Sequence, residues 1–174
     1  LADYPFGRVI YGYNPDAANP DEAGMNPEII GMLNAQQVQA PALRIDVGWL
    51  TIKHVDEVFT FVPTGKPESP YKVLIHDVNL MINLVQGWKD QGYGASAFLT
   101  PYKNVTVNSF LNNINLKNYN TNLQTNRIEP IVALLKAEFK LKDDDFIRLP
   151  SYFESGNSYV PNMINCLLLN GHLI

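Results

Sequence analysis

The pattern of apolar and polar positions predicts a chain in which strands and helices follow one another. The segment 47–62 is the most β-like, and its alternation predicts two strands that meet near Lys53 and His54. Further strands are expected at residues 7–12, 43–46, 71–76, 146–149 and 166–169. Alternating strands and helices are typical of the α/β class, which we take as the fold class.

Helical periodicity and capping residues predict three helices. Asn26-Pro27-Glu28 has the composition of a helix start, and a buried stripe is expected to follow it. Asp77 is expected to cap a second helix, and Glu129-Pro130 to begin a third. The apolar residues of the three expected faces are, in order, Ile29, Ile30 and Leu33; Met81, Leu84, Val85 and Trp88; and Ile128, Ile131, Val132, Leu135 and Phe139.

Composition and charge exclude several classes of protein. A length of 174 residues suits about one domain. The net charge of −4 offers no basic surface, so we expect no nucleic-acid partner. Apolar runs fall far short of the ~20 residues that a membrane helix requires, so no membrane partner is expected. The single cysteine, Cys166, excludes an internal disulfide framework and a metal site built from several cysteines.

Both ends of the sequence have the character of cut ends. The chain begins with Leu1 rather than Met and stops on the apolar residues Leu173 and Ile174. We therefore expect residues 1–174 to be the middle segment of a longer domain, truncated at both ends. We expect a cytoplasmic protein, although an unseen N-terminus leaves secretion open. Self-association of the chain into a homo-oligomer also stays open.

The string His54-Val55-Asp56-Glu57 contains the best candidates for catalytic residues. On an extended strand, His54 and Asp56 would point to the same face. An imidazole transfers protons near neutral pH, and a carboxylate beside it binds a cation or orients the ring. The alternative is a strand end whose polar side chains simply face water. A metal site is less favoured, because Glu57 would point to the opposite face.

Other polar residues have structural explanations. His76 and Asp77 lie where a strand passes into a helix, and Asp77 has a sufficient role as the helix cap. Cys166 has apolar neighbours, which favours a small buried side chain over a reactive thiol. Asn162 and Asn165 flank an apolar pair, and their amides could line a polar site or tie down a loop.

Several strings, taken in order, resemble the catalytic domain of the protein-arginine deiminases. They span nearly the whole chain and keep the order of the family. The most specific strings are Ala-Gln-Gln-Val-Gln-Ala-Pro and His-Val-Asp-Glu. The strings are Tyr4-Pro5-Phe6-Gly7-Arg8-Val9-Ile10, Leu33-Asn34-Ala35-Gln36-Gln37-Val38-Gln39-Ala40-Pro41, Trp49-Leu50-Thr51, His54-Val55-Asp56-Glu57-Val58-Phe59-Thr60-Phe61-Val62-Pro63, Val160-Pro161-Asn162-Met163-Ile164-Asn165 and Gly171-His172-Leu173.

The resemblance implies a partial pentein fold, an α/β propeller of ββαβ modules around a central site. It also implies hydrolysis of peptidyl-arginine to peptidyl-citrulline and ammonia, with arginine-containing proteins as substrates and calcium as the activating ion. No calcium ligand is identified in this segment. The family's general acid/base matches His54, and one of its two guanidinium-binding aspartates matches Asp56.

The chain also departs from the family. The second aspartate and the nucleophilic cysteine belong to strings outside it, and Cys166 matches an ordinary hydrophobic position. Lys53 stands where the family has glycine, which alters access or backbone freedom. We therefore expect residues 1–174 alone to be inactive. A deiminase of free guanidine compounds with the same fold, or a degenerate deiminase-like binding module, is the alternative.

Overall fold

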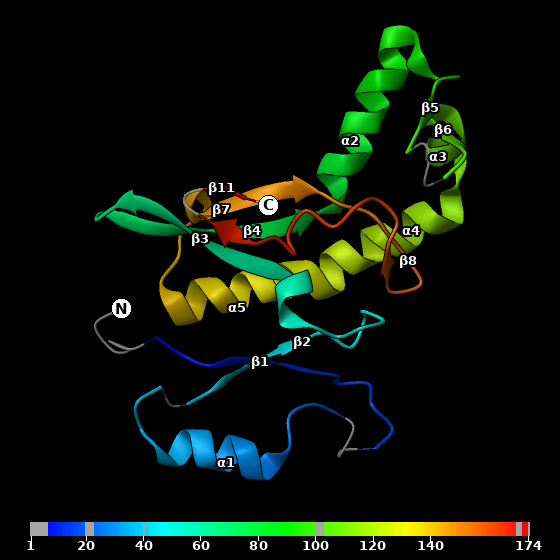
Figure 1. The fold of residues 1–174 in the computed structure, drawn as a ribbon. Coiled ribbons are helices and arrows are strands. Elements are labelled where there is room, and N and C mark those ends of the chain that lie inside the picture. The colour runs from blue at the N-terminus through cyan, green and yellow to red at the C-terminus, as the bar shows by residue number, and fades with distance from the viewer. Residues whose placement is uncertain (1–6, 20–22, 40, 100–102, 170–171, 174) are drawn as a thin grey trace.

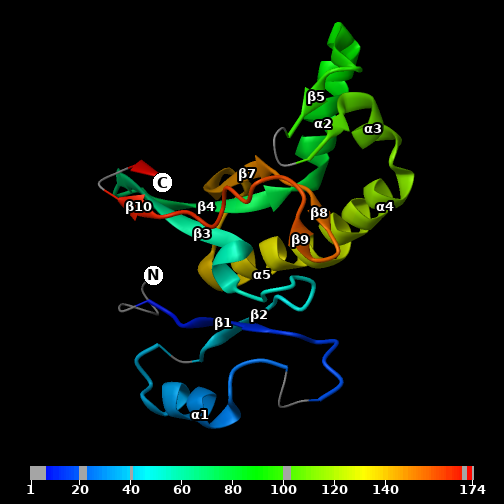
Figure 2. The ribbon, with the colours of Figure 1, turned by 45° about the vertical axis from the view of Figure 1, so that its right-hand side comes forward.

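The fold was analysed in a computed structural model, which describes residues 7–19, 23–39, 41–99, 103–169 and 172–173. It is a mixed α/β fold, which confirms the fold class. A central sheet lies between the other elements, with the β1–β2 pair and helix α1 on one side and the long helix α2 extending from another (Figure 1). Figure 2 shows the same arrangement after a turn of 45°.

The central sheet contains three strands in the order β3-β4-β7. β3 (Phe59–Lys66) is antiparallel to β4 (Ser69–Asp77), and β7 (Phe146–Pro150) is parallel to β4. The middle strand β4 is buried on both faces, since Val73 and Ile75 alternate with Leu74 and His76, all at 3% exposure or less. A strand covered on both faces loses the apolar–polar alternation of a half-exposed strand.

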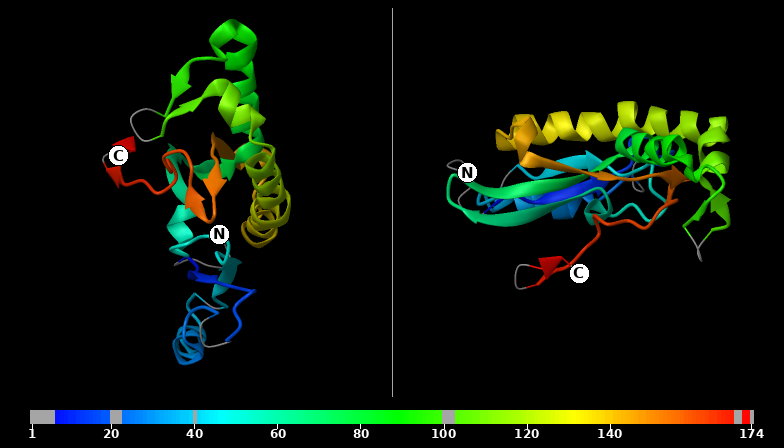
Figure 3. Two further views of the ribbon diagram at one scale, coloured as in Figure 1. Left: turned by 90° about the vertical axis from the view of Figure 1, so that its right-hand side faces the viewer. Right: turned by 90° about the horizontal axis from the view of Figure 1, so that it is seen from above.

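Among the described residues, four α-helices lie between β4 and β7 along the chain, and the first and last of them each bury an apolar face in the core. Asp77 caps α2 (Val78–Trp88) by accepting a hydrogen bond from the amide of Leu80, as expected. Helix α5 (Glu129–Phe139) buries its predicted apolar face, and Figure 3 shows it running along the sheet. The order β3, β4, helices, β7 is that of one ββαβ unit.

The N-terminal part forms a separate small layer. β1 (Ile10–Tyr13) pairs in parallel with β2 (Leu43–Asp46), and α1 (Pro27–Ala35) connects them. Asn26 caps α1 as predicted. The predicted buried stripe is wrong, because Ile29 is 46% exposed and Ile30 and Leu33 are only half-buried. The helix lies at the outer edge of the molecule, and a helix buries a stripe only against a neighbouring element (Figure 1).

The remaining elements are short. Residues 104–126, which are rich in asparagine, form helices with capped starts, in which the Thr106 and Asn113 side chains accept from backbone amides. The expected strand at 166–169 is reduced to its last two residues. The elements are a 3-10 turn η2 (Val55–Glu57), π-turns η3 (Lys89–Tyr93) and η4 (Gln124–Ile128), β5 (Ala97–Phe98), β6 (Val105–Thr106), α3 (Val107–Asn112), α4 (Ile114–Leu123), a 3-10 turn η5 (Asp143–Asp145), β8 (Phe153–Glu154), β9 (Asn157–Ser158), β10 (Leu168–Leu169) and β11 (His172–Leu173).

Candidate functional site

The candidate residues lie on a tight turn, residues 54–57, rather than on a strand. Val55–Glu57 forms the 3-10 turn η2, which contacts β1 and leads into β3. The Val58 amide donates to the Val55 carbonyl at 3.0 Å, and the His54 amide donates to Glu57 Oε2 at 3.2 Å. Residues 48–52 form turns and bends, and the following strand begins only at Phe59. Of the two strands predicted to meet near Lys53 and His54, the first is therefore wrong and the second begins later than predicted.

The turn also changes the basis on which His54 and Asp56 were paired. A 3-10 helix has about three residues per turn, so alternate residues do not share a face as they do in a strand. Both side chains are exposed to solvent. Within the described part of the chain, no hydrogen bond or ion pair joins them. The structure thus leaves His54 and Asp56 open to solvent two residues apart, but strand geometry does not aim them at one point.

Lys53 enters the turn in the left-handed backbone conformation, with φ of +68°. A side chain with a Cβ is strained there by about 1–2 kcal/mol, whereas glycine adopts it freely. This is the position where the resemblance places glycine. Lys53 therefore occupies a backbone site that suits glycine, immediately before His54.

The other end of the turn is fixed from inside the protein by His76. The ring of His76 is 1% exposed, and its Nε2 lies 2.6 Å from the carbonyl oxygen of Glu57. Burial lowers the pKa of His76 from 6.5 to about 4, although the hydrogen bond to the Glu57 carbonyl opposes this. The imidazole is therefore neutral at pH 7. The expectation of a structural role for His76 missed this contact, because the two residues are 19 positions apart.

Two further polar residues surround this contact. Ser151 Oγ lies 2.7 Å from His76 Nδ1, and Asn162 Nδ2 donates to the Glu57 carbonyl at 3.2 Å. Asn162 Oδ1 accepts from the Ile164 amide at 2.9 Å. Of the two alternatives left open for Asn162, these contacts favour tying down a loop, and they tie it to the candidate turn.

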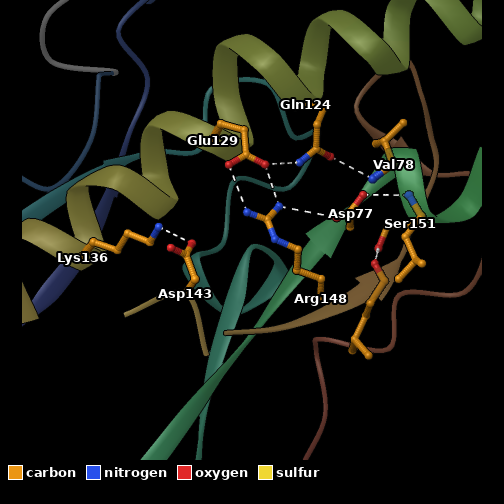
Figure 4. Close-up of polar contacts among 10 residues, drawn as sticks. Asp77, Val78, Gln124, Glu129, Lys136, Asp143, Arg148 and Ser151 are labelled. Atoms are coloured by element: carbon orange, nitrogen blue, oxygen red, sulfur yellow. Dashed lines mark hydrogen bonds and ion pairs between the residues drawn. The ribbon is translucent and has the colours of Figure 1, made fainter. Parts of the chain in front are cut away.

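A network of charged and amide side chains secures the strand that carries His76 (Figure 4). Arg148 on β7 donates to both carboxylate oxygens of Glu129, at 2.6 and 3.1 Å. Gln124 donates to Glu129 and accepts from the amide of Val78, both within 2.8 Å. The hydrogen bonds from Arg148 lower the pKa of Glu129, a direction that burial opposes. The network joins β7 and α5 to the point where β4 passes into α2.

The apolar cavities lie elsewhere. A cavity of about 420 Å³ lies between β1, the hairpin of β3 and β4, and the end of α5. Its lining includes Phe61, whose ring packs edge to face against those of Tyr71 and Phe139. Nothing in its lining matches the acid–base chemistry expected of the candidate site, so the site remains the 54–57 turn.

The described residues contain neither a cluster of metal-binding side chains nor a helix that could span a membrane. Across the ranges that the structure describes, His, Cys, Asp and Glu nowhere gather in threes around a common point. These residues therefore do not fit a calcium site. The described helices are too short or too polar to cross a bilayer. Cys166 is half-buried rather than part of the core, so its expected burial is only partly met.

Comparison with known proteins gives the class. A family model described as protein-arginine deiminase (PAD) matches residues 2–174. Protein-arginine deiminase type-4 of Mus musculus is 32% identical over 182 aligned residues, covering 98% of this chain and 27% of that protein. The type-1 enzyme of Homo sapiens is 31% identical, covering 98% of this chain and 26% of that protein.

The chain therefore belongs to the protein-arginine deiminase family. It spans about a quarter of the length of the curated relatives that it matches. This confirms the resemblance of the ordered strings.

Proposed function

We propose that this chain is a middle segment of a pentein-fold catalytic domain that hydrolyses peptidyl-arginine to peptidyl-citrulline and ammonia. The observation that carries the proposal is the family match over residues 2–174, together with the solvent exposure of His54 and Asp56 within the matching string. The ββαβ order of β3, β4 and β7 is consistent with one module of a pentein. The substrate class proposed is protein carrying arginine.

The two residues have distinct proposed roles. Asp56 binds the planar guanidinium cation, because a carboxylate accepts two parallel charge-assisted hydrogen bonds from it. His54 donates a proton to the amine that leaves as ammonia and takes one from the attacking water. The carbon–nitrogen bond of the guanidinium breaks, a carbon–oxygen bond forms, and the product is the neutral ureido group. The nucleophilic thiol and the second carboxylate are not assigned to residues 1–174, so the chain alone is proposed to be inactive.

Calcium enters this proposal only as a dependence of the whole protein. The described residues supply no ligand cluster for it, and no step is assigned to the ion. The proposal also includes a cytoplasmic location, again as a property of the whole protein.

The test is citrulline formation by the full-length protein that contains this chain. We expect His54→Ala and Asp56→Asn to lower turnover at least ~100-fold while the melting temperature stays within a few degrees. Asp144→Asn is the matched control, since Asp144 is an exposed carboxylate in the distant η5 turn. Its turnover should stay within about twofold of wild type.

Substrate choice separates the proposal from its alternatives. Arginine in a peptide should be consumed, and free arginine or agmatine should not. Preference for the free compounds would assign the chain to a free-guanidine deiminase. An unchanged rate in both site variants would instead support a deiminase-like module without catalysis, in line with the strained Lys53 at its entrance. Measurements with calcium and with a chelator test the calcium dependence.

A further inference from the structure

The carbonyl of Glu57 is the point where the candidate turn meets the protein interior. It accepts from His76 Nε2 at 2.6 Å and from Asn162 Nδ2 at 3.2 Å. A carbonyl oxygen can only accept, so the proton of the neutral imidazole must sit on Nε2. The residues that follow, Val58 and Phe59, are buried at 0% and 4% exposure. The end of the turn at Glu57 is therefore held by the protein interior, whereas His54 and Asp56 face solvent.

His76 is held more firmly than an ordinary loop residue. It lies on β4, the middle strand, and pairs in register with Leu149 of β7. Its ring packs edge-on against Phe153, with centroids 4.9 Å apart, and against Trp49 at 6.4 Å. The hydroxyl of Ser151 lies at hydrogen-bond distance from the other ring nitrogen. Packing and two polar partners together fix the direction in which Nε2 donates.

Asn162 cannot replace this anchor. Its hydrogen bond to the same carbonyl is longer, and a longer bond is weaker. The residues on either side of it, Pro161 and Met163, are exposed, whereas His76 itself is 1% exposed and the preceding Ile75 is 0% exposed. The hydrogen bond from His76 therefore determines the position of the Glu57 carbonyl, and the loop that carries Asn162 adapts to it.

We propose that His76 is a positioning residue of the candidate deiminase site, because its Nε2–H holds the Glu57 carbonyl and so fixes the turn that carries His54 and Asp56. The inference rests on the proposed function for its catalytic meaning. His76 does not touch the reacting groups. Its contribution is to keep the general acid/base and the guanidinium anchor in one arrangement, since small displacements of reacting groups are costly in rate.

A matched pair of substitutions tests this directly in the full-length protein. His76→Gln places an amide donor near the position of Nε2, and His76→Asn places it near Nδ1 instead. Both remove the ring, so both lose packing. We expect kcat/KM for an arginine peptide to stay within about threefold of wild type in H76Q and to fall about 10- to 100-fold in H76N. Folded fractions are matched by circular dichroism before the comparison.

A second measurement does not depend on activity. The Val58 amide, which donates to Val55 within the turn, is followed by hydrogen exchange. We expect wild-type protection in H76Q, about tenfold faster exchange in H76N, and unchanged amides in the paired part of β4 in both. Ser151→Ala, which removes the hydroxyl beside Nδ1 together with its hydrogen bond to the Leu149 carbonyl, should keep Val58 protected.

Equal loss of activity and of Val58 protection in H76Q and H76N overturns the positioning role and leaves a packing role. Rescue by Gln alone in both measurements supports it. If the wild-type protein forms no citrulline, the proposed function fails, and the exchange contrast still decides whether His76 holds the turn.

Discussion

Acidification should destabilise this protein through His76 as the pH falls from 6.5 toward about 4. The imidazole is 1% exposed, and burial lowers its pKa from 6.5 to about 4. Between these two values the unfolded chain binds a proton that the folded chain does not, so folding becomes less favourable as the pH falls. The contribution is fully present above pH 6.5 and is lost as the pH falls toward 4.

The size of the effect follows from the gap between the two pKa values. At ~1.4 kcal/mol per pH unit, the gap between 6.5 and about 4 corresponds to about 3 kcal/mol in total. About 2 kcal/mol of this should be lost between pH 7 and pH 5. That window is diagnostic, because the carboxylates with perturbed pKa values, Glu129, Asp143 and Asp145, are all shifted downward and titrate at lower pH.

The assay is urea unfolding at half-unit steps from pH 7.5 to 4.5, on wild type and on His76→Gln. Glutamine does not titrate, so the variant should start less stable but lose much less of its stability between pH 7 and pH 5. His54→Gln, which makes the same replacement at an exposed histidine, is the matched control. Parallel losses in wild type and His76→Gln would contradict a role for His76 in the pH dependence, because they would assign the dependence to other groups.

Three further substitutions test the local structure by thermal or urea unfolding. Lys53→Gly should stabilise the chain by about 0.5–1 kcal/mol by relieving the left-handed backbone at φ +68°, and Lys53→Ala should bring no such gain. Asp77→Ala should cost about 1 kcal/mol through loss of the cap on the Leu80 amide, whereas Asp77→Asn should retain most of it. Leu135→Ala should cost about 3 kcal/mol, since Leu135 is 0% exposed and its removal leaves a cavity.

The elements that could be predicted from sequence are those whose cause is local. The cap of α2 at Asp77 and the apolar face of α5 from Ile128 to Phe139 are each determined by residues that lie close together in the sequence. The same logic gave the start of α1 at Asn26 but not its burial, because burial of Ile29 depends on a neighbour that no local pattern specifies.

The position of the candidate turn could be predicted from the sequence, but its backbone conformation could not. The alternation around His54 is compatible with a strand, and nothing in it reports the positive φ of Lys53 or the return of the Glu57 carboxylate to the His54 amide. The contacts of His76 with Glu57 and Ser151 span 19 and 75 residues. Sequence periodicity does not predict contacts between residues so far apart. The prediction of His54 and Asp56 rests instead on the ordered strings that resemble the family.

The placement of the turn separates the two residues proposed to be catalytic from those that stabilise the fold. His54 and Asp56 are exposed, and exposed polar side chains contribute little to folding. The turn they occupy is instead secured by the neighbouring Glu57 carbonyl, which is bound to the buried His76. Substitutions of the two exposed residues should therefore act on chemistry with the fold intact. A substitution at the buried anchor acts on both, which is why its effect on rate must be read from a matched pair of variants rather than from a single loss.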